Sequence, residues 1–348
     1  MTAPSPLQSG ERATATDQRQ KVLFIGGLGR SGSTLVESLL NELPQTFSVG
    51  ETIHLWERGV RDRQRCACGR AFDHCPHWDA VGSEAFDGWN QVDLEDLIDL
   101  RWSIDRSRRL PGIAWHHLRG RPSDDERRYL DHLRSVLLAS AAVANSAGPR
   151  PDLLLESSKH LSTAALLSMD PLLDVRVLHL VRDPRGVAYS WTKYVERPET
   201  DDEVMPTYRP IRTALRWLSD NLGFELLGRR VPTLTMRYED FVADPVGSIR
   251  AVAELVDITL GDDDLRFING NRATITSPMH SVAGNPMRFG GSDLTLRLDE
   301  AWRTKLGARD RRLVTAVTAP LLAAYRYLQP RRRPKPPAAP QPRGCPLP

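Results

Sequence analysis

The sequence KVLFIGGLGRSGSTLVESLLNE, residues 21–42, joins a short apolar run, a glycine-rich turn and a segment with leucines at helical spacing. The apolar run Val22–Ile25 predicts a buried parallel strand. The leucines predict a helix that begins at Ser33-Thr34 and ends before Pro44. Such a turn directs free backbone N–H groups and the positive end of the helix dipole at one point, which is typical of an anion-binding site.

The turn nearly matches the phosphate-binding pattern G-x-x-x-x-G-K-[ST], from Gly27 to Thr34. Ser33 occupies the lysine position, and Arg30 lies inside the loop. A nucleoside triphosphatase needs that lysine on its phosphates, so the sequence favours a different phosphate-bearing donor. A glycine-rich strand–turn–helix can also be a plain tight connection, and a second motif is therefore needed to decide its role.

A second anion motif lies in VRVLHLVRDPRGVAYSW, residues 175–191. Its apolar run predicts a buried strand, Asp183-Pro184 a turn, and the residues that follow a helix. Arg182 stands at the end of the strand and Ser190 about two turns into the helix, so both can face one bound anion. An arginine offers a charged fork and a serine a hydroxyl donor. Arg182 alone would be an ordinary surface residue, but no simple packing reason explains both motifs together.

The loop R-S-G-S-T and the later R-D-P-R-x-x-x-x-S resemble the sulfotransferases that use 3′-phosphoadenosine 5′-phosphosulfate (PAPS). MRYEDFVADP, residues 236–245, and HSVAGNPMRF, residues 280–289, resemble further family segments in the same order. The resemblance spans about residues 21–290 and is to the branch of bacterial carbohydrate and small-molecule members and protein-tyrosine sulfotransferases. It implies three groups of nucleotide contacts: Gly29, Arg30, Ser31, Gly32, Ser33 and Thr34 on the 5′-phosphosulfate, Arg182 and Ser190 on the 3′-phosphate, and Asn285 and Arg288 on the 3′-phosphate or the adenine.

Sulfuryl transfer to an alcohol needs charge stabilisation on the leaving phosphate and a base for the acceptor proton. Arg30 and the loop backbone suit the first role. Glu51, in SVGETIHLW after a predicted strand over 47–49, is the favoured base, and its G-E-T resembles the glutamate segment of the protein-tyrosine branch. His54 is the rival base. The alternative for Glu51 is a carboxylate that merely begins a helix.

Lys159, in LLLESSKH, follows another predicted strand and could contact the sulfuryl group or the bridging oxygen. The E-S-S-K segment resembles a D-S-S-K segment of related members, with Glu156 in place of aspartate, which puts its geometry in doubt. A solvated lysine is the alternative.

The chain alternates predicted strands and helices, which indicates an α/β fold with a central parallel sheet flanked by helices, as in the P-loop-like sulfotransferases, and ligands at the carboxyl ends of the strands. The predicted strands are 152–156, 174–181 and 232–237, and the predicted helices are 161–169, 185–195, 210–229, 245–256 and 309–328, the last packing on the sheet. Residues 21–329 form one predicted domain, in which 56–150 are a helical insert on the acceptor side with helices near 93–109 and 124–145. Residues 1–20 and the proline-rich, basic tail 330–348 are predicted to be disordered or extended.

Composition is compatible with such an enzyme. Among 348 residues, 40% are hydrophobic, which supports a substantial core, and a net charge of +3 is too mild to indicate a nucleic-acid partner. No signal peptide or membrane-spanning run is visible, so we expect a cytoplasmic protein. The oligomeric state and the identity of the acceptor have no readable signal.

Three cysteines cluster in CACGRAFDHCPHW, residues 66–78, whereas Cys345 lies alone near the end of the chain. A tetrahedral zinc set is available in Cys66, Cys68, Cys75 and His77. The C-x-C spacing is tighter than the usual zinc knuckle, however, and a disulfide, disfavoured in cytosol, or ordinary buried thiols are alternatives. The pattern also resembles a segment of some bacterial sulfotransferases, without implying a role. The favoured interpretation is that no metal is required.

The sequence thus predicts a sulfotransferase that moves the sulfuryl group of PAPS to a hydroxyl of a carbohydrate, glycolipid or other small metabolite. A small-molecule kinase on a related scaffold is one alternative, and the missing loop lysine argues against it. A nucleotide-binding module without catalysis is another, and the candidate base beside the loop argues against that.

Overall fold

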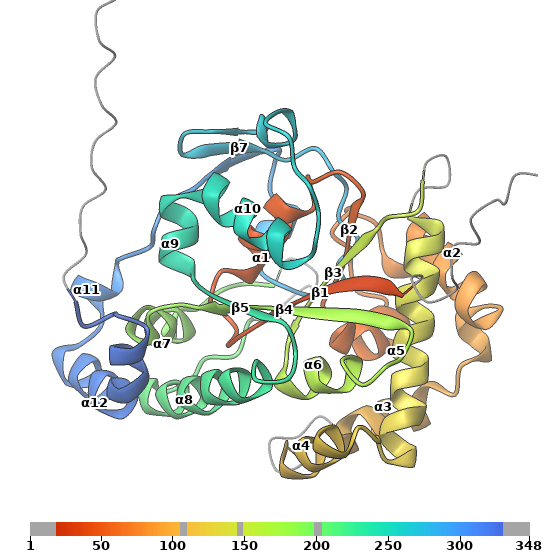
Figure 1. Ribbon diagram of the computed structural model, residues 1–348, viewed down its shortest axis with the longest axis horizontal. Coiled ribbons are helices and arrows are strands. Elements are labelled where there is room, and N and C mark those ends of the chain that lie inside the picture. Colours follow the sequence, from red (N-terminus) through yellow and green to blue (C-terminus); the bar gives the residue numbers. More distant parts are fainter. Residues whose placement is uncertain (1–18, 105–109, 145–148, 198–203, 330–348) are drawn as a thin grey trace, which may run out of the picture.

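The computed structural model describes residues 19–104, 110–144, 149–197 and 204–329. The predictions for residues 1–18 and for the tail 330–348 lie outside the described residues. A parallel five-stranded sheet forms the centre of the molecule (Figure 1), in the order β2-β3-β1-β4-β5. Its strands are β1 (Gln20–Gly26), β2 (Thr46–Gly50), β3 (Leu153–Lys159), β4 (Leu173–Val181) and β5 (Thr233–Arg237).

Strand β1 lies in the middle of the sheet because its apolar run is buried on both faces, as parallel strands require. Val22 and Phe24 contact the core on one face, with α6 (Leu161–Leu167) and α8 (Pro210–Leu227). Leu23 and Ile25 contact the core on the other face. That face is covered by α1 (Ser33–Leu40), α9 (Tyr238–Ala243) and α10 (Pro245–Leu255), as Figure 1 shows. The α/β prediction is therefore confirmed.

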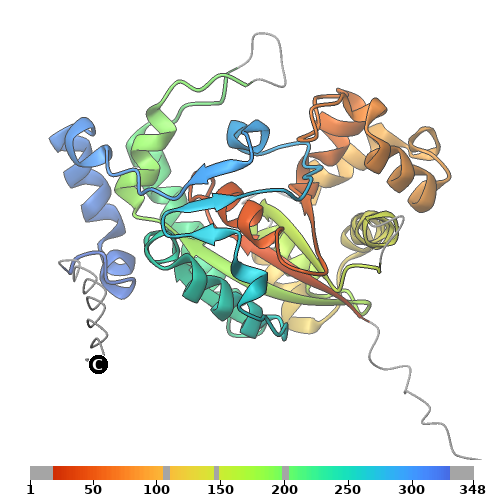
Figure 2. The same ribbon diagram turned by 90° about the horizontal axis from the view of Figure 1, so that it is seen from above.

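The described part of the segment between β2 and β3 is helical, as predicted. It contains the short 3₁₀ turns η1 (Thr52–His54), η3 (Phe72–His74) and η4 (Trp89–Gln91) and the π-helix η2 (Leu55–Arg61). Its α-helices are α2 (Pro76–Phe86), α3 (Leu94–Ile104), α4 (Leu110–Arg119) and α5 (Asp124–Val143). Helix α5 begins with a capping box between Ser123 and Glu126. Buried Trp56, Trp78 and Tyr129 belong to the same core cluster as Val22 of the sheet. The insert is therefore packed on the domain and gathers at one side of the sheet (Figures 1 and 2).

The C-terminal part differs from prediction in two respects. Helix α12 (Ala308–Ala324) packs against α7 (Pro184–Thr192) and α8, at the opposite side of the molecule from the insert (Figure 2), and not on the sheet as predicted. The reason is that Val314 of α12 packs with Ala188 of α7 and Ala214 of α8 in a small buried cluster separate from the main cores. Three short strands form an antiparallel sheet that the sequence did not indicate: β6 (Ile268–Asn269), β7 (Arg272–Thr274) and β8 (Asp293–Thr295). Helix α11 (Trp302–Lys305) and the turns η6 (Asp263–Leu265) and η7 (Pro286–Phe289) complete the described elements.

None of the helices in the described ranges is both long enough and apolar enough to cross a bilayer.

Candidate active site

The glycine-rich loop connects β1 to α1 in a tightly packed turn. Gly27 and Gly32 have φ of +130° and +93°, a region that favours glycine. A Cβ at Gly32 would lie 2.3 Å from the ring of Tyr238, and one at Gly27 would lie 2.5 Å from the carbonyl oxygen of Leu180. Gly32 precedes α1 and provides no side-chain cap. The first N–H groups of α1 therefore remain available to an anion.

A cavity of about 940 Å³ opens at the carboxyl ends of the strands. Eleven of the thirteen residues predicted to bind the nucleotide or to take part in catalysis line it: Gly29, Arg30, Gly32, Ser33, Thr34, Glu51, His54, Lys159, Arg182, Ser190 and Asn285. The other two, Ser31 and Arg288, are buried beside it. The two anion motifs and the candidate bases thus meet in one place, because parallel strands end at a common edge.

The lining of the cavity is strongly basic. Eight lysines and arginines line it, but only three acidic residues do. The basic residues are Arg30, Arg58, Arg101, Lys159, Arg182, Lys193, Arg216 and Arg297, and the acidic ones are Glu51, Asp220 and Asp299. A concave site with this excess of positive charge concentrates anionic ligands. It suits a donor that carries several phosphate or sulfate charges.

Glu51, Lys159 and His54 form a compact cluster in the cavity. Lys159 Nζ lies 2.5 Å from Glu51 Oε1 and donates a second hydrogen bond to the carbonyl oxygen of Ser157 at 2.8 Å. His54 Nε2 lies 3.7 Å from the other carboxylate oxygen of Glu51. Lys159 is the last residue of β3, where its φ of +69° departs from the strand conformation. A cation and two potential bases therefore share one small region.

The E-S-S-K segment, residues 156–159, holds the chain next to this cluster through hydrogen bonds. Glu156 accepts hydrogen bonds from the N–H of Thr52 at 3.1 Å and from its hydroxyl at 2.7 Å. The hydroxyl of Ser158 accepts a hydrogen bond from the N–H of Ile53 at 3.0 Å. Glu156 is completely buried, which raises its pKa. In this chain Glu156 therefore holds the segment that follows Glu51.

His54 is held in its neutral form. Its pKa lies well below the ordinary value, first because burial disfavours the charged ring and then because Arg58 and other cationic neighbours repel it. A neutral imidazole has a lone pair that can accept a proton, so His54 remains the rival to Glu51, but a pKa this far below the ordinary value makes the ring a weak base. Glu51 immediately precedes η1, but its side chain makes no helix-capping hydrogen bond there. The helix-start alternative for Glu51 therefore receives no support from the observed geometry.

Arg30 and Arg182 lie on the other wall. The Arg30 guanidinium stands over the ring of Trp191, 5.2 Å from its centroid, and burial lowers its pKa. Arg182 Nη1 donates to the carbonyl oxygen of Arg30 at 3.0 Å, and its Nη2 to that of Asp299 at 3.3 Å. Arg182 is thus bound to the glycine-rich loop itself, and Ser190 follows on α7.

The 280–289 loop closes the cavity on the side of Glu51. The N–H of Asn285 lies 3.4 Å from Thr34 Oγ1. A Cβ at Gly284 would lie 3.3 Å from Glu51 Oε1. Arg288 turns inward, where its Nη1 donates to the carbonyl oxygen of Gly284 at 3.0 Å. Asn285 therefore lines the cavity, whereas Arg288 does not line it and instead holds the loop through its hydrogen bond to Gly284.

Several cavity residues were not expected from the sequence. Trp191 donates through Nε1 to the carbonyl oxygen of Gly29 at 3.0 Å, and its ring lies 4.8 Å from that of Tyr208. Lys193 and Arg297 also line the cavity. Trp191 directly follows Ser190 in the second motif, but an aromatic residue late in a helix is more often part of the core than of a site.

A buried carboxyl group behind the loop was also missed. Glu37 of α1 accepts hydrogen bonds from Ser48 at 2.5 Å and from Ser157 at 2.8 Å. Burial raises its pKa to about 7, although both hydroxyls oppose the shift. A glutamate inside an apolar helix gave no sequence signal, because the two serines that face it come from different strands.

The Glu37→Gln substitution should change how stability depends on pH. A folded-state pKa of about 7 against an ordinary 4.5 means that the native protein binds more protons than the unfolded chain between these values. The contribution of Glu37 to the free energy of unfolding is therefore fully present below pH 4.5 and is lost as pH rises through about 7, a change of up to about 3 kcal/mol. The glutamine variant should match the wild type near pH 4 and exceed its free energy of unfolding at pH 8, as measured by urea denaturation. Exposed Glu84→Gln is the control; equal pH profiles for Glu37→Gln and wild type would contradict the prediction.

The cysteines gather away from this cavity, and their histidine partner differs from the predicted one. The Sγ atoms of Cys66, Cys68 and Cys75 lie with Nδ1 of His280, not with His77. His77 is directed into the core, where its ring lies 4.9 Å from that of Phe47, and burial lowers its pKa to about 3. The predicted ligand set is therefore wrong in its fourth member.

The chain is similar to one family model and to several solved structures. The sequence model of the sulfotransferase family matches residues 23–262. No curated protein matches the chain. Among solved structures, it is similar to the sulfotransferase domain of the Synechococcus PCC 7002 olefin synthase, with 19% identity over 88% of this chain and 98% of that chain and a TM-score of 0.45. It is also similar to a mouse sulfotransferase complexed with PAP, with 10% identity over 90% and 91% of the two chains and a TM-score of 0.43. Sulfotransferase STF9 from Mycobacterium avium shares 14% identity over 89% and 77%, with a TM-score of 0.41.

The family match covers well over half of the chain, and the parallel sheet, the glycine-rich loop and the basic cavity agree with it. The chain belongs to the sulfotransferase family, and the protein is a sulfotransferase.

Proposed function

We propose that this enzyme transfers the sulfuryl group of PAPS to a hydroxyl group of a carbohydrate, glycolipid or other small metabolite. The observation that carries the proposal is the meeting of both anion motifs with Glu51, Lys159 and His54 in one basic cavity. PAPS carries a phosphosulfate at one end of its ribose and a phosphate at the other. Arg30 and Arg182, two cationic side chains from different motifs, line the same wall of the cavity and suit a ligand with two anionic groups.

The chain's own groups supply the donor contacts. The N–H groups at the start of α1 and Arg30 hold the 5′-phosphosulfate, while Arg182 and Ser190 hold the 3′-phosphate. Trp191 and Tyr208 offer aromatic faces in the same wall, on which a purine can stack. Lys159 neutralises charge on the sulfuryl oxygens or the bridging oxygen as the leaving phosphate forms.

Glu51 acts as the base. It takes the proton of the acceptor hydroxyl while the acceptor oxygen bonds to sulfur and the bond from sulfur to the phosphate oxygen breaks. The products are the sulfate ester, adenosine 3′,5′-bisphosphate and the proton on Glu51. Lys159, at 2.5 Å from Glu51 Oε1, keeps the carboxylate directed into the cavity before the acceptor arrives. His54 in its neutral form is the alternative acceptor of that proton.

Transfer should not need Mg²⁺, because Arg30, Lys159 and backbone donors take the place of the metal as the phosphate clamp. Turnover of PAPS in buffers freed of divalent cations should equal turnover with Mg²⁺ added. Removing cations from the buffer, with no chelator in contact with the protein, leaves any firmly bound structural metal undisturbed. A strict need for Mg²⁺, with ATP consumed and a phosphorylated product, would instead identify a kinase.

A further inference from the structure

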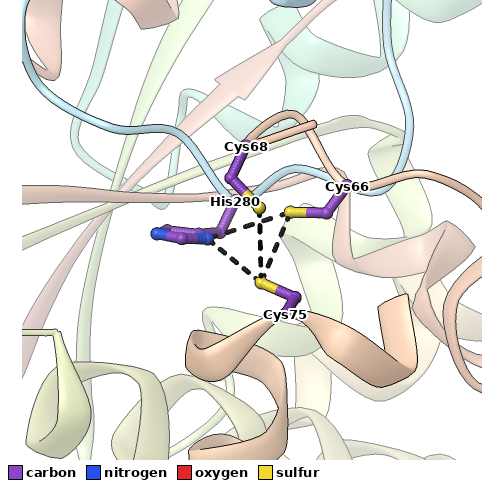
Figure 3. A group of neighbouring side chains, drawn as sticks. All are labelled: Cys66, Cys68, Cys75 and His280. Atoms are coloured by element: carbon purple, nitrogen blue, oxygen red, sulfur yellow. Dashed lines mark hydrogen bonds between the residues drawn. The ribbon is translucent and has the colours of Figure 1, made fainter. Parts of the chain in front are cut away.

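Four potential metal ligands meet outside the active-site cavity (Figure 3). Three are the sulfurs of Cys66, Cys68 and Cys75, and the fourth is Nδ1 of His280. All four atoms lie within 4.8 Å of one another. Cys66 and Cys75 are completely buried, whereas Cys68 is exposed and His280 is half-buried. Ordinary buried thiols face apolar neighbours, but here three sulfurs and a nitrogen face one another.

Four of the six distances between the ligand atoms are close to those of a tetrahedron around one zinc ion, and the other two are at most 4.8 Å. Zinc bonds of about 2.3 Å to sulfur and about 2.05 Å to nitrogen give edges of about 3.8 Å between sulfurs and about 3.6 Å between sulfur and nitrogen. Cys75 Sγ lies 3.6 Å from that of Cys68 and 3.7 Å from that of Cys66. His280 Nδ1 lies 3.3 Å from Cys75 Sγ and 3.8 Å from Cys66 Sγ. A disulfide needs about 2.05 Å, so no pair of these cysteines is bonded.

Local backbone structure builds the cluster from two distant parts of the chain. The N–H of Cys66 bonds to the carbonyl oxygen of Arg70 at 2.8 Å, and the N–H of Gly69 to that of Cys66 at 2.9 Å. Gly69, at φ +87°, makes this turn possible. Cys75 stands immediately before α2. From the other side, the carbonyl oxygen of His280 accepts a hydrogen bond from Trp78 Nε1 at 2.6 Å.

We propose that Cys66, Cys68, Cys75 and His280 bind one structural Zn²⁺. Three thiolates and a neutral imidazole complete a four-ligand set with no open position, which is the structural and not the catalytic type of zinc site. Binding replaces three thiol protons, which pass to solvent, and no oxidation or reduction takes place. Soft thiolate ligands with one imidazole select zinc over magnesium or calcium.

The ion joins the helical insert to the loop that closes the active site. The N–H of Ala67 also bonds to the carbonyl oxygen of Ser281 at 2.9 Å, so the two segments run together at this point. His280 is followed four positions later by Gly284, where an added Cβ would lie 3.3 Å from Glu51 Oε1. The metal therefore anchors the 280–289 loop without entering the cavity.

The test begins with metal analysis of the intact protein purified without chelators. We expect one zinc per chain by inductively coupled plasma mass spectrometry. After zinc is exchanged for Co²⁺, we expect the visible absorption bands of tetrahedral cobalt and the thiolate-to-cobalt charge-transfer band. His280→Gln should lose the metal, and His280→Cys should restore it as a four-cysteine site. His77→Gln is the matched control, because it removes the histidine whose ring stacks on that of His280 at 4.7 Å but which is not one of the four ligands, and it should keep one zinc per chain.

A second measurement uses the unaltered chain, in case the variants fail to fold. Exposed Cys68 should resist alkylation in the native protein and react once zinc is removed by a chelator, with the unfolded chain as the reference rate. Hydrogen exchange in residues 280–289 should rise after zinc removal. A protein that holds no zinc and binds no cobalt, a His280→Gln variant that keeps its zinc, or a Cys68 that is alkylated freely while zinc is bound would overturn the proposal.

Discussion

Glu51→Gln should lower kcat for an alcohol acceptor by about 10²–10⁴-fold and leave the affinity for adenosine 3′,5′-bisphosphate nearly unchanged. The amide keeps the shape of the side chain but cannot take the acceptor proton. The variant also loses the ion pair with Lys159, which lies 2.5 Å away. Bisphosphate affinity therefore serves as the check that the cavity remains intact. His54→Asn should have a smaller effect if His54 only orients the acceptor.

A phenolic acceptor shows whether Glu51→Gln lowers kcat because the base is lost or because the ion pair with Lys159 is lost. A phenol is already acidic and needs a base less than an alcohol does, so the Glu51→Gln defect should shrink with a phenol. Lys159→Gln removes charge from the sulfuryl end with either acceptor, so its defect should shrink less with a phenol than the defect of Glu51→Gln. If His54→Asn abolishes turnover while Glu51→Gln is near normal, His54 is the base.

Arg182→Ala should erase the preference for adenosine 3′,5′-bisphosphate over AMP. Loss of a charge-assisted contact costs about 1.5–3 kcal/mol, which corresponds to about a 10- to 150-fold weaker binding of the bisphosphate. Binding of AMP should change little, because AMP lacks the phosphate that Arg182 contacts. Isothermal titration calorimetry with both ligands measures the difference directly.

Two controls protect this assignment. Arg182 also donates to the carbonyl oxygen of Arg30 in the glycine-rich loop. If its role were only to hold that loop, AMP and the bisphosphate would weaken equally in Arg182→Ala. Ser190→Ala, which removes a neutral hydroxyl, should reduce the same preference by a smaller factor. Equal affinities of the native protein for AMP and the bisphosphate would rule the 3′-phosphate site out.

The sequence predicted the sheet and the convergence of the site because both depend on short-range patterns. A buried apolar run followed by glycines or by Arg182 marks the end of a parallel strand, and such ends share one edge. The alternation of apolar residues and turns was therefore enough to place Glu51, Lys159 and Arg182 near one another. Their catalytic and binding roles remain predictions.

Features made by contacts between distant segments were not predictable. The fourth member of the cysteine cluster comes from His280, 214 positions after Cys66, whereas the sequence offered the adjacent His77. The contact between Glu156 and Thr52 spans 104 positions. The antiparallel sheet of β6–β8 was missed because strands of two or three residues are too short to show a period.

The carbonyl oxygens of the glycine-rich loop have a consequence for ligand affinity. Those of Gly29 and Arg30 are already bonded to Trp191 and Arg182, so the loop's peptide planes are held before any ligand arrives. A loop that is ordered in advance loses little conformational entropy when it binds, and more of the contact energy appears as affinity. The same bonds connect α7 to the loop, so a change at Trp191 would weaken donor binding through entropy even if no contact with the donor were lost.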